Sequence, residues 1–489
     1  MNHVTAIHRN QTSIQAKVSD YIRKHEARYI EIVRDLLRVP GISTTGEGMA
    51  ESAEACLAHL KRVAPDARLV ETGGYPTVYG RSRSSRPDAK TLLIYCLYDE
   101  TPVDFDQWKS DPFGANIVEA EQLGLDPSMG AVICGRAASN HRGPMLSTIL
   151  AVEAMQRIGG DLPLNIVWLW EGEEEIGSPN LGNCIKQQHD DIMECDGMWL
   201  PAMHQRRPGG SMPLYRGVRG LNLVELECRG GEWGGVRDGR HIWSGWLPFV
   251  DAPMMRLIHA VGSLYDADHK LTIDGLAERL DAITAEEREQ IKLLEDATDA
   301  SAEKAMKQVV NVNELRGGRS MQELIPGWVS NPQINIQGFH GGYDGPHFYT
   351  MMPQNVSAKI DVRLPGGVSP EQLQELLKTH LHRRGFPEIP VRCHGYEAQQ
   401  TDVEDEICQA AIRAAATCGV QTQIWPASNG CAPHAFFGKE PYNLPCSIAG
   451  LGHGGNIHAP DEYITVGSIR AHMDFTVNYL HEWAFGPTA

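Results

Sequence analysis

The 489-residue sequence lacks the marks of several classes of protein. It has no C-x-x-C pair, no internal repeat and no low-complexity segment, and its longest apolar run is the seven residues 92–98. A helix that spans a bilayer needs about 20 apolar residues, so this run is too short. The first 20 residues contain no apolar signal core. We therefore expect neither a secretory signal nor a membrane anchor.

Positive charge is also scarce. The 44 lysines and arginines are outnumbered by 62 aspartates and glutamates, which leaves a formal charge of −18. An acidic surface repels phosphate backbones and anionic lipids, so we expect no nucleic-acid partner and no membrane partner. The eleven cysteines are scattered and odd in number, which is typical of reduced thiols. These features predict a cytoplasmic protein.

The composition supports a large folded core. Hydrophobic residues make up 42% of the chain and charged residues 22%, which excludes a disordered protein. The length is typical of two or three domain-sized units. The 49 glycines and 29 prolines favour a loop-rich fold of the kind found in enzymes over a helical bundle.

Two kinds of pattern alternate along the chain. Up to residue 213, buried runs alternate with amphipathic helices, which predicts an α/β fold with a mostly parallel sheet covered by helices on both faces. From residue 214 half-exposed strands predict a smaller α+β unit, and the α/β pattern returns after residue 395. We thus expect a catalytic domain of residues 1–213 and 396–489, and an inserted lid of residues 214–395. The expected helices are 13–39, 49–63, 145–158, 254–265, 285–310, 370–381 and 405–418, and the expected strands are 67–71, 78–80, 92–98, 164–170, 221–228, 333–337 and 356–364.

Two segments carry chemistry. Residues 171–178 read EGEEEIGS and directly follow a predicted buried strand, where open α/β sheets place their ligands. Neighbouring carboxylates repel one another there unless a cation or a shared proton relieves them, which favours a metal ligand beside a general base. A solvated acidic loop is the alternative interpretation. Residues 452–463 form a glycine-rich loop around His458, and such a loop lets a histidine approach a metal closely.

Together with residues 93–99 and 134–144, these segments resemble the ArgE/DapE/carnosinase family of dinuclear zinc metallopeptidases and amidohydrolases. EGEEEIGS is matched residue for residue, and HAPDEY at residues 458–463 differs from the family's HAPNEY at one position. Residues 215–220 fit YGTRG apart from one extra residue and a valine. The resemblance covers nearly the whole chain. It implies a zinc-peptidase-like mixed sheet flanked by helices, with an inserted α+β lid through which two chains form a homodimer.

The resemblance also implies roles for individual residues. Glu174 matches the general base, and Asp99 matches the aspartate that orients a histidine ligand. Glu175 and His458 match metal ligands, and Asn140 falls on the carboxylate that bridges both metals. On the substrate side, Arg363 matches the arginine that pairs with a substrate carboxylate. Cys431 stands in the loop that reads GSIP in the family, and Trp243 stands where the lid histidine of HSG reaches the partner's active site.

Three metal positions depart from the family pattern. Leu97 and Ala202 replace the two ligands that bind only one of the family's two metals. The neutral amide of Asn140 is a poor bridging ligand between zinc ions. We therefore expect the second metal site to be lost and at most one divalent metal, zinc or manganese, to remain, or none. Whether His141 and His204 replace the lost metal ligands stays open, and so does whether His241 replaces the lid histidine.

Three functions remain open at this point. The first is an amide-bond hydrolase, of dipeptidase, carboxypeptidase or deacylase type, acting on a small carboxylate-bearing substrate with Glu174 as base. The second is a metal-independent hydrolase, lyase or acyl transferase in the same pocket, with Cys96 as an alternative nucleophile. The third is a catalytically silent binding protein. The complete EGEEEIGS segment favours an enzyme, because a silent site has no physical need for clustered carboxylates.

Overall fold

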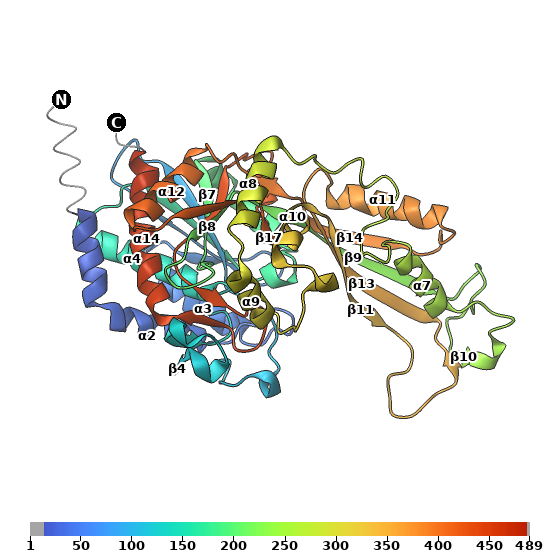
Figure 1. Cartoon of the computed structure of the whole chain (residues 1–489). Coiled ribbons are helices and arrows are strands. Elements are labelled where there is room, and N and C mark those ends of the chain that lie inside the picture. The colour runs from blue at the N-terminus through green and yellow to red at the C-terminus, as the bar shows by residue number, and fades with distance from the viewer. Residues whose placement is uncertain (1–13, 487–489) are drawn as a thin grey trace.

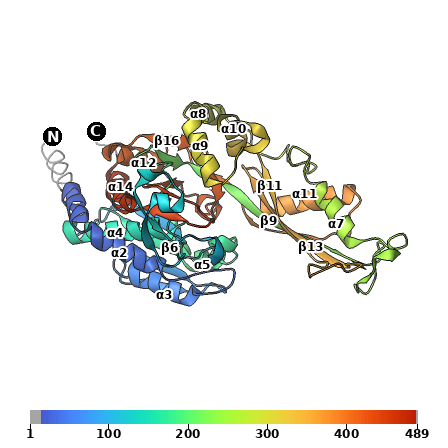
Figure 2. The ribbon, with the colours of Figure 1, turned by 60° about the horizontal axis from the view of Figure 1, so that its bottom comes forward.

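A computed structural model describes residues 14–486, without the side chains of residues 308, 309 and 429. Residue 13 of the expected first helix, and most of the segment considered for a signal, lie outside these residues. The molecule has two parts, a larger one around a wide sheet and a narrower one that extends away from it (Figures 1 and 2).

An eight-stranded mixed sheet forms the centre of the larger part, in the order β1-β2-β6-β3-β7-β18-β8-β16. Its middle strands are parallel, because β3 pairs in parallel with both β6 and β7, and β7 in parallel with β18. The strands are β1 (Arg68–Val70), β2 (Thr77–Ser82), β3 (Thr91–Leu97), β6 (Asn165–Glu171), β7 (Gly197–Pro201), β8 (Met212–Tyr215), β16 (Thr422–Trp425) and β18 (Cys446–Ala449).

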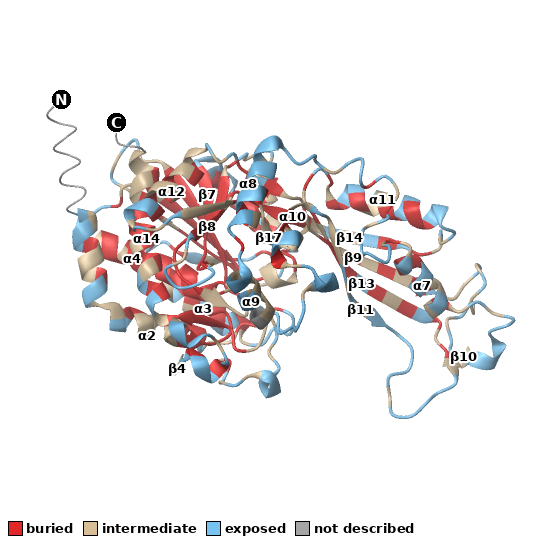
Figure 3. Ribbon diagram, in the orientation of Figure 1, coloured by how far each residue is buried: buried red, intermediate tan, exposed pale blue. Residues whose placement is uncertain are grey.

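Helices bury both faces of this sheet. Alternate residues of β3 belong to two different apolar clusters: Ile94 packs with the cluster that includes α4 and α14, and Tyr95 with the cluster that includes α5. Figure 3 shows these strands buried. The predicted α/β architecture is therefore confirmed. The helices are α2 (Glu26–Leu37), α3 (Met49–Leu60), α4 (Arg142–Gly159), α5 (Leu181–Gln187), α6 (His189–Met193), α12 (Glu406–Thr417), α13 (Ala435–Gly438) and α14 (Val466–Phe485).

A second, four-stranded sheet brings distant loops together. Its order is β19-β20-β5-β4, so the loop after β5 lies beside the loop between β19 and β20. The strands are β4 (Asn116–Glu119), β5 (Ala131–Cys134), β19 (Gly454–Gly455) and β20 (Tyr463–Thr465). Short 3-10 turns interrupt the loops, at η1 (Phe105–Gln107), η2 (Ala120–Leu123), η3 (Pro127–Met129), η4 (Glu174–Ile176), η5 (Ser244–Trp246) and η6 (Arg316–Gly318).

The narrower part is the inserted α+β unit. The strand β9 (Gly217–Arg229) begins against β15 (Gln399–Gln400) and β17 (Ser428–Cys431), and continues into a sheet of order β11-β13-β9-β14. Helices α7 and α11 pack on this sheet, and a two-stranded ribbon of β10 and β12 lies at its far end (Figure 1). The bounds are α7 (Pro253–Gly262), α11 (Pro370–Arg383), β10 (Ile242–Trp243), β11 (Gln333–His340), β12 (Met351–Met352), β13 (Asn355–Leu364) and β14 (Val391–Tyr396).

Two of the predicted helices are interrupted. The single helix expected over residues 285–310 is wrong: α8 (Ala285–Asp296) ends and α9 (Ala300–Val309) begins anew, because the Asp299 carboxylate accepts the Ala302 N–H at 2.8 Å and caps the second helix. The helix expected over residues 13–39 breaks at His25, where the backbone leaves the helical region.

The segment of residues 285–310 is rich in charged residues, but it also has an apolar face. Ile291 and Leu294 of α8 pack with α10 (Met321–Ser330) and with Trp425 of β16. These helices therefore lie between the two parts of the molecule (Figure 2). Within residues 14–486, no helix is long and apolar enough to cross a membrane.

Candidate active site

The acidic segment lies at the carboxyl end of β6, next to the end of β3. The turn η4 presents Glu174 and Glu175, and the buried Asp99 carboxylate accepts the Glu174 N–H at 3.2 Å and the Glu175 N–H at 3.0 Å. Burial raises the pKa of Asp99 to about 6, while these hydrogen bonds act to lower it. Leu97 carries no imidazole for Asp99 to orient, so Asp99 holds the backbone of the turn that carries the expected base.

Glu174 has the surroundings of a strong base. Burial and the neighbouring Glu175 carboxylate raise its pKa well above the usual range, and Arg363 acts in the opposite direction. A raised pKa increases the proton affinity of the ionised carboxylate, which is the form in which a general base acts.

Asn140, Glu175 and His458 come together from three distant segments. The Asn140 Nδ2 atom lies 2.7 Å from Glu175 Oε1 and 3.1 Å from His458 Nε2. His458 Nε2 in turn contacts Glu175 Oε2 at 2.9 Å. The structure therefore clusters all three residues expected as metal ligands, but they hydrogen-bond to one another.

These side chains do not fit a zinc ion held by the protein alone. Structural and catalytic zinc sites use three or four ligands drawn from histidine, cysteine, aspartate and glutamate. No group of three such residues within the described part of the chain is arranged to hold a metal. Asn140 turns its amide nitrogen, a donor, toward the other two residues. Leu97 and Ala202 are buried and offer no ligand atom.

The nearby histidines form a pair. The rings of His141 and His204 lie with their centroids 6.0 Å apart, and burial lowers the pKa to about 3 for His141 and to about 4 for His204. Both therefore stay neutral. His241 belongs to the lid, where its Nδ1 accepts the Gln354 N–H at 3.3 Å.

Sequence reasoning missed Glu462. This buried carboxylate pairs with Arg136 at 2.9 Å and accepts the backbone N–H groups of Ala137, Ser139 and Asn140 at 2.9–3.2 Å. It thereby fixes the loop that carries Asn140. The signal was available, because Glu462 belongs to the HAPDEY segment that also contains His458.

The expected substrate-side residues separate into two places. Arg363 lies near the end of β13 and contacts Asp361 at 3.4 Å, and its charge acts on Glu174 and on Cys431. Burial raises the Cys431 pKa to about 11, so the thiol stays protonated. Trp243 is not brought to Glu174: it is 60% exposed and lies on β10 at the far end of the lid (Figure 1).

Cys96 is unsuited to act as a nucleophile. It is buried in the apolar cluster that includes α4 and α14, and burial raises its pKa well above the usual range. A thiol in such a place is inert, because the reactive form is the thiolate.

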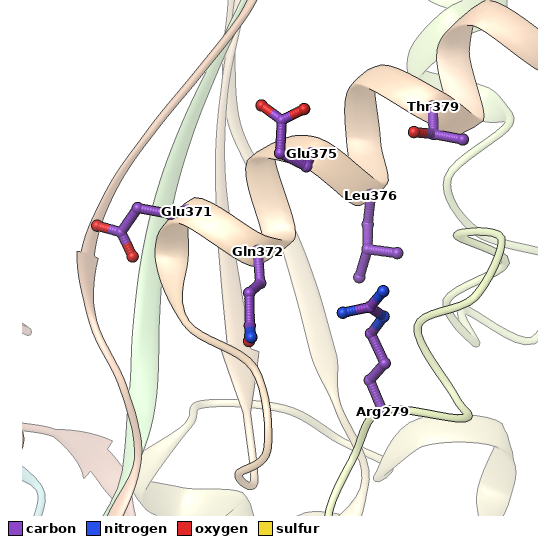
Figure 4. A pocket seen from close by; sticks show the side chains of 6 residues that line it. All are labelled: Arg279, Glu371, Gln372, Glu375, Leu376 and Thr379. Atoms are coloured by element: carbon purple, nitrogen blue, oxygen red, sulfur yellow. The ribbon is translucent and has the colours of Figure 1, made fainter.

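A hollow of about 300 Å³ elsewhere does not belong to this site. It lies on the outer side of α11 in the lid (Figure 4). None of the residues placed around Glu174 lines it; the lining residues are Arg279, Glu371, Gln372, Glu375, Leu376 and Thr379.

The chain is similar to known peptidases over most of its length. A family model described as peptidase family M20/M25/M40 matches residues 106–482. The mouse Beta-Ala-His dipeptidase is 26% identical over 364 residues, covering 69% of this chain. The Cys-Gly metallodipeptidase DUG1 of Saccharomyces cerevisiae is 27% identical over 326 residues, covering 62% of this chain. The aligned segments span 66% and 59% of these two relatives, respectively.

Solved structures share the fold. The M20 family metallo-carboxypeptidase Sso-CP2 from Sulfolobus solfataricus superposes with a TM-score of 0.80 at 28% identity, covering 93% of this chain and 99% of that one. The S. cerevisiae di-peptidase Dug1p superposes with a TM-score of 0.79 at 22% identity, covering 97% and 99%. The second likeness shows the fold alone.

Proposed function

Because the chain belongs to peptidase family M20/M25/M40, we propose that it hydrolyses a peptide or amide bond in a small substrate with a free carboxylate, such as a dipeptide. The observation that carries the proposal is the half-buried Glu174, held by Asp99 through the backbone of its turn and close enough to Arg363 to be affected by that charge. The names of the relatives, two dipeptidases and a carboxypeptidase, support the substrate class.

The proposed reaction uses residues of this chain. Glu174 accepts a proton from a water molecule, and the water oxygen forms a bond to the carbonyl carbon while the π pair of the C=O bond moves to oxygen. The carbonyl then re-forms and the C–N bond breaks, and the leaving nitrogen takes the proton back from Glu174. Arg363 binds the substrate carboxylate through charge-assisted hydrogen bonds and so positions the amide.

Replacing Glu174 by glutamine tests this proposal. Glutamine keeps the shape and removes the proton acceptor, so kcat on dipeptides should fall by about 10²–10⁴-fold with little change in KM. Arg363→Ala is the control, because it should mainly raise KM for substrates with a free carboxylate. Full turnover by the Glu174→Gln protein would rule out Glu174 as the base.

We also propose that each chain binds at most one divalent metal, zinc or manganese, for which Glu175 and His458 would be two ligands and water or substrate would supply the others. Support comes from the contact of these two side chains at 2.9 Å and from the apolar residues Leu97 and Ala202 at the other expected positions. Elemental analysis of the purified protein should find no more than one metal per chain. Two tightly held metals about 4 Å apart would contradict the proposal.

The assembly and location belong to the same proposal. We expect a homodimer through the lid, in which Trp243 of each chain approaches the active site of the other. Support comes from the exposure of Trp243 on β10, at the end of the lid that points away from the larger part of the molecule (Figure 1). A cytoplasmic location is supported by the eleven cysteines, all of which are unpaired.

A further inference from the structure

The root of the lid sheet faces the turn that carries Glu174. Leu221 of β9 is paired with Tyr396 of β14 on one side and with Arg363 of β13 on the other. Directly paired residues of antiparallel strands share a face of the sheet, so Tyr396 and Arg363 flank Leu221 on one face. Leu223 lies two residues further along and on the same face, and a Cβ placed on Gly177 would meet its side chain at 2.7 Å. This face therefore looks toward the η4 turn.

The hydroxyl of Tyr396 is buried there without a partner. Tyr396 is 4% exposed, and within the described residues its Oη atom makes no hydrogen bond. Buried tyrosine hydroxyls ordinarily find a partner, and an unpartnered one costs stability. Two buried tyrosines of the same region follow that rule, because Tyr95 donates to Glu171 and Tyr98 donates to the Pro76 carbonyl at 2.6 Å.

The groups around this hydroxyl are those of the candidate site. Among the ionisable groups that act on Tyr396, Glu174 has the largest effect, followed by Cys431 and Glu171, while Arg363 acts in the opposite direction. Burial raises the Tyr396 pKa well above its usual range. The phenol thus stays neutral and can donate a hydrogen bond, but it cannot act as a base.

An unpartnered donor matters because the proposed hydrolysis needs one. The carbonyl oxygen gains negative charge when water adds, and enzymes stabilise that charge with preorganised donors or cations. Leu97 and Ala202 leave this chain without ligands for a second cation. The Tyr396 hydroxyl lies on the sheet face that looks toward the turn carrying Glu174, and it shares that face with Arg363, which is expected to hold the substrate carboxylate. An amide bound between Glu174 and Arg363 would therefore lie against this donor.

We propose that the Tyr396 hydroxyl is a catalytic group that donates a hydrogen bond to the carbonyl oxygen of the scissile amide as that oxygen becomes an oxyanion. The inference rests on the proposed function. No proton leaves Tyr396: the hydrogen bond forms as the π pair moves to oxygen and weakens when the carbonyl re-forms and the C–N bond breaks.

The variant Tyr396→Phe removes only this hydroxyl. In dipeptide hydrolysis it should lower kcat by about 10²–10³-fold, the usual effect of losing one oxyanion donor, with KM changed by less than about threefold. The melting temperature should stay the same or rise, since no protein hydrogen bond is lost. Tyr98→Phe is the matched control: it should lower the melting temperature, because Pro76 loses its donor, and keep kcat.

The possible outcomes separate this inference from the proposed function. Unchanged kcat in Tyr396→Phe, together with loss of activity in Glu174→Gln, would overturn the inference and leave the function standing. A raised KM with unchanged kcat would place the hydroxyl on the bound substrate and would also overturn it, as would a fall in kcat matched by a fall in melting temperature. Absence of peptide hydrolysis by the unmodified protein would overturn both.

Discussion

Glu462 shows how one side chain supports the site without belonging to it. Its buried carboxylate pairs with the Arg136 guanidinium and accepts hydrogen bonds from three backbone N–H groups. Replacing Glu462 by glutamine leaves the buried Arg136 charge without a counter-charge. The glutamine NH₂ group is itself a donor and would face the backbone N–H donors. Glu462→Gln should therefore lower the free energy of unfolding by about 3–5 kcal/mol, measured by urea denaturation.

Asp35→Asn is the control for that measurement. Asp35 pairs with Arg38 at 2.6 Å on the surface, where both side chains are exposed. An exposed ion pair contributes less than about 1 kcal/mol, so this variant should unfold almost as the unmodified protein does. Equal effects of the two substitutions would show that the contacts of Glu462 are not what holds the loop.

His472 gives the stability a pH dependence of known sign. Its ring is buried against Trp199 and Thr148, and burial lowers its pKa to about 4. An unfolded chain has a histidine pKa near 6.5, so between these values the unfolded state binds more protons and stability falls as pH falls. At pH 5 this difference in proton binding lowers the free energy of unfolding by about 2 kcal/mol. His472→Gln should reduce the stability lost between pH 7 and pH 5 by that amount.

Urea denaturation of both proteins at the two pH values measures this difference directly. The comparison between proteins is needed because buried carboxyls with raised pKa values, such as Glu171, contribute with the opposite sign in both. The same loss of stability in both proteins would contradict a neutral, buried His472.

At the residue scale the sequence predicted positions better than contacts. The motifs placed Glu175, His458 and Asn140 in one cluster, and the structure brings them within 3.1 Å of one another. Their roles stay predictions. The sequence could not predict which atom of Asn140 faces Glu175. It also could not predict that Tyr396 lies on the sheet face that looks toward the Glu174 turn. Both depend on loops and strands joined across more than 30 residues of chain, for which the local pattern carries no information.

At the scale of elements, β9 connects the two parts of the molecule. Its first residues pair with β15 and β17, and its remainder pairs with β13 and β14. The sequence predicted a strand only over 221–228, because the preceding residues 217–220 contain two glycines and an arginine instead of an alternating pattern. Those glycines permit close approach of a neighbouring backbone.

Gly217 can therefore be tested as an element of this junction. A Cβ at position 217 would overlap the Gln399 carbonyl oxygen in β15. Gly217→Ala should push β15 away from β9 and lower the free energy of unfolding by about 1–3 kcal/mol. Gly467→Ala is the matched control, since a Cβ there meets nothing within 4 Å on helix α14. It should raise stability by about 0.5–1 kcal/mol. Thermal or urea unfolding measures both effects. A neutral Gly217→Ala substitution would contradict the close packing of β15 against β9.

At the scale of the whole molecule, the far end of the lid is unusually apolar for a free surface. Trp243, Trp246, Phe249, Phe348 and Tyr349 are all at least half exposed there, with Phe249 at 80%. Clustered exposed aromatic side chains mark surfaces that bind another protein. A second copy of the chain is the occupant in the proposed homodimer. Light scattering after size exclusion should then give twice the chain mass of 54.0 kDa.

Charge placed in this surface should separate the copies. The double variant Trp246→Asp, Phe249→Asp should elute as a monomer, because burying two carboxylates between apolar side chains is strongly unfavourable. Met193→Asp, at an exposed apolar position on α6 in the larger part, should remain a dimer. If Trp243 reaches the active site of the other chain, the monomeric variant loses turnover and the Met193→Asp dimer keeps it. Full activity in the monomer would mean that each chain holds a complete site, and would remove Trp243 from the substrate-binding residues.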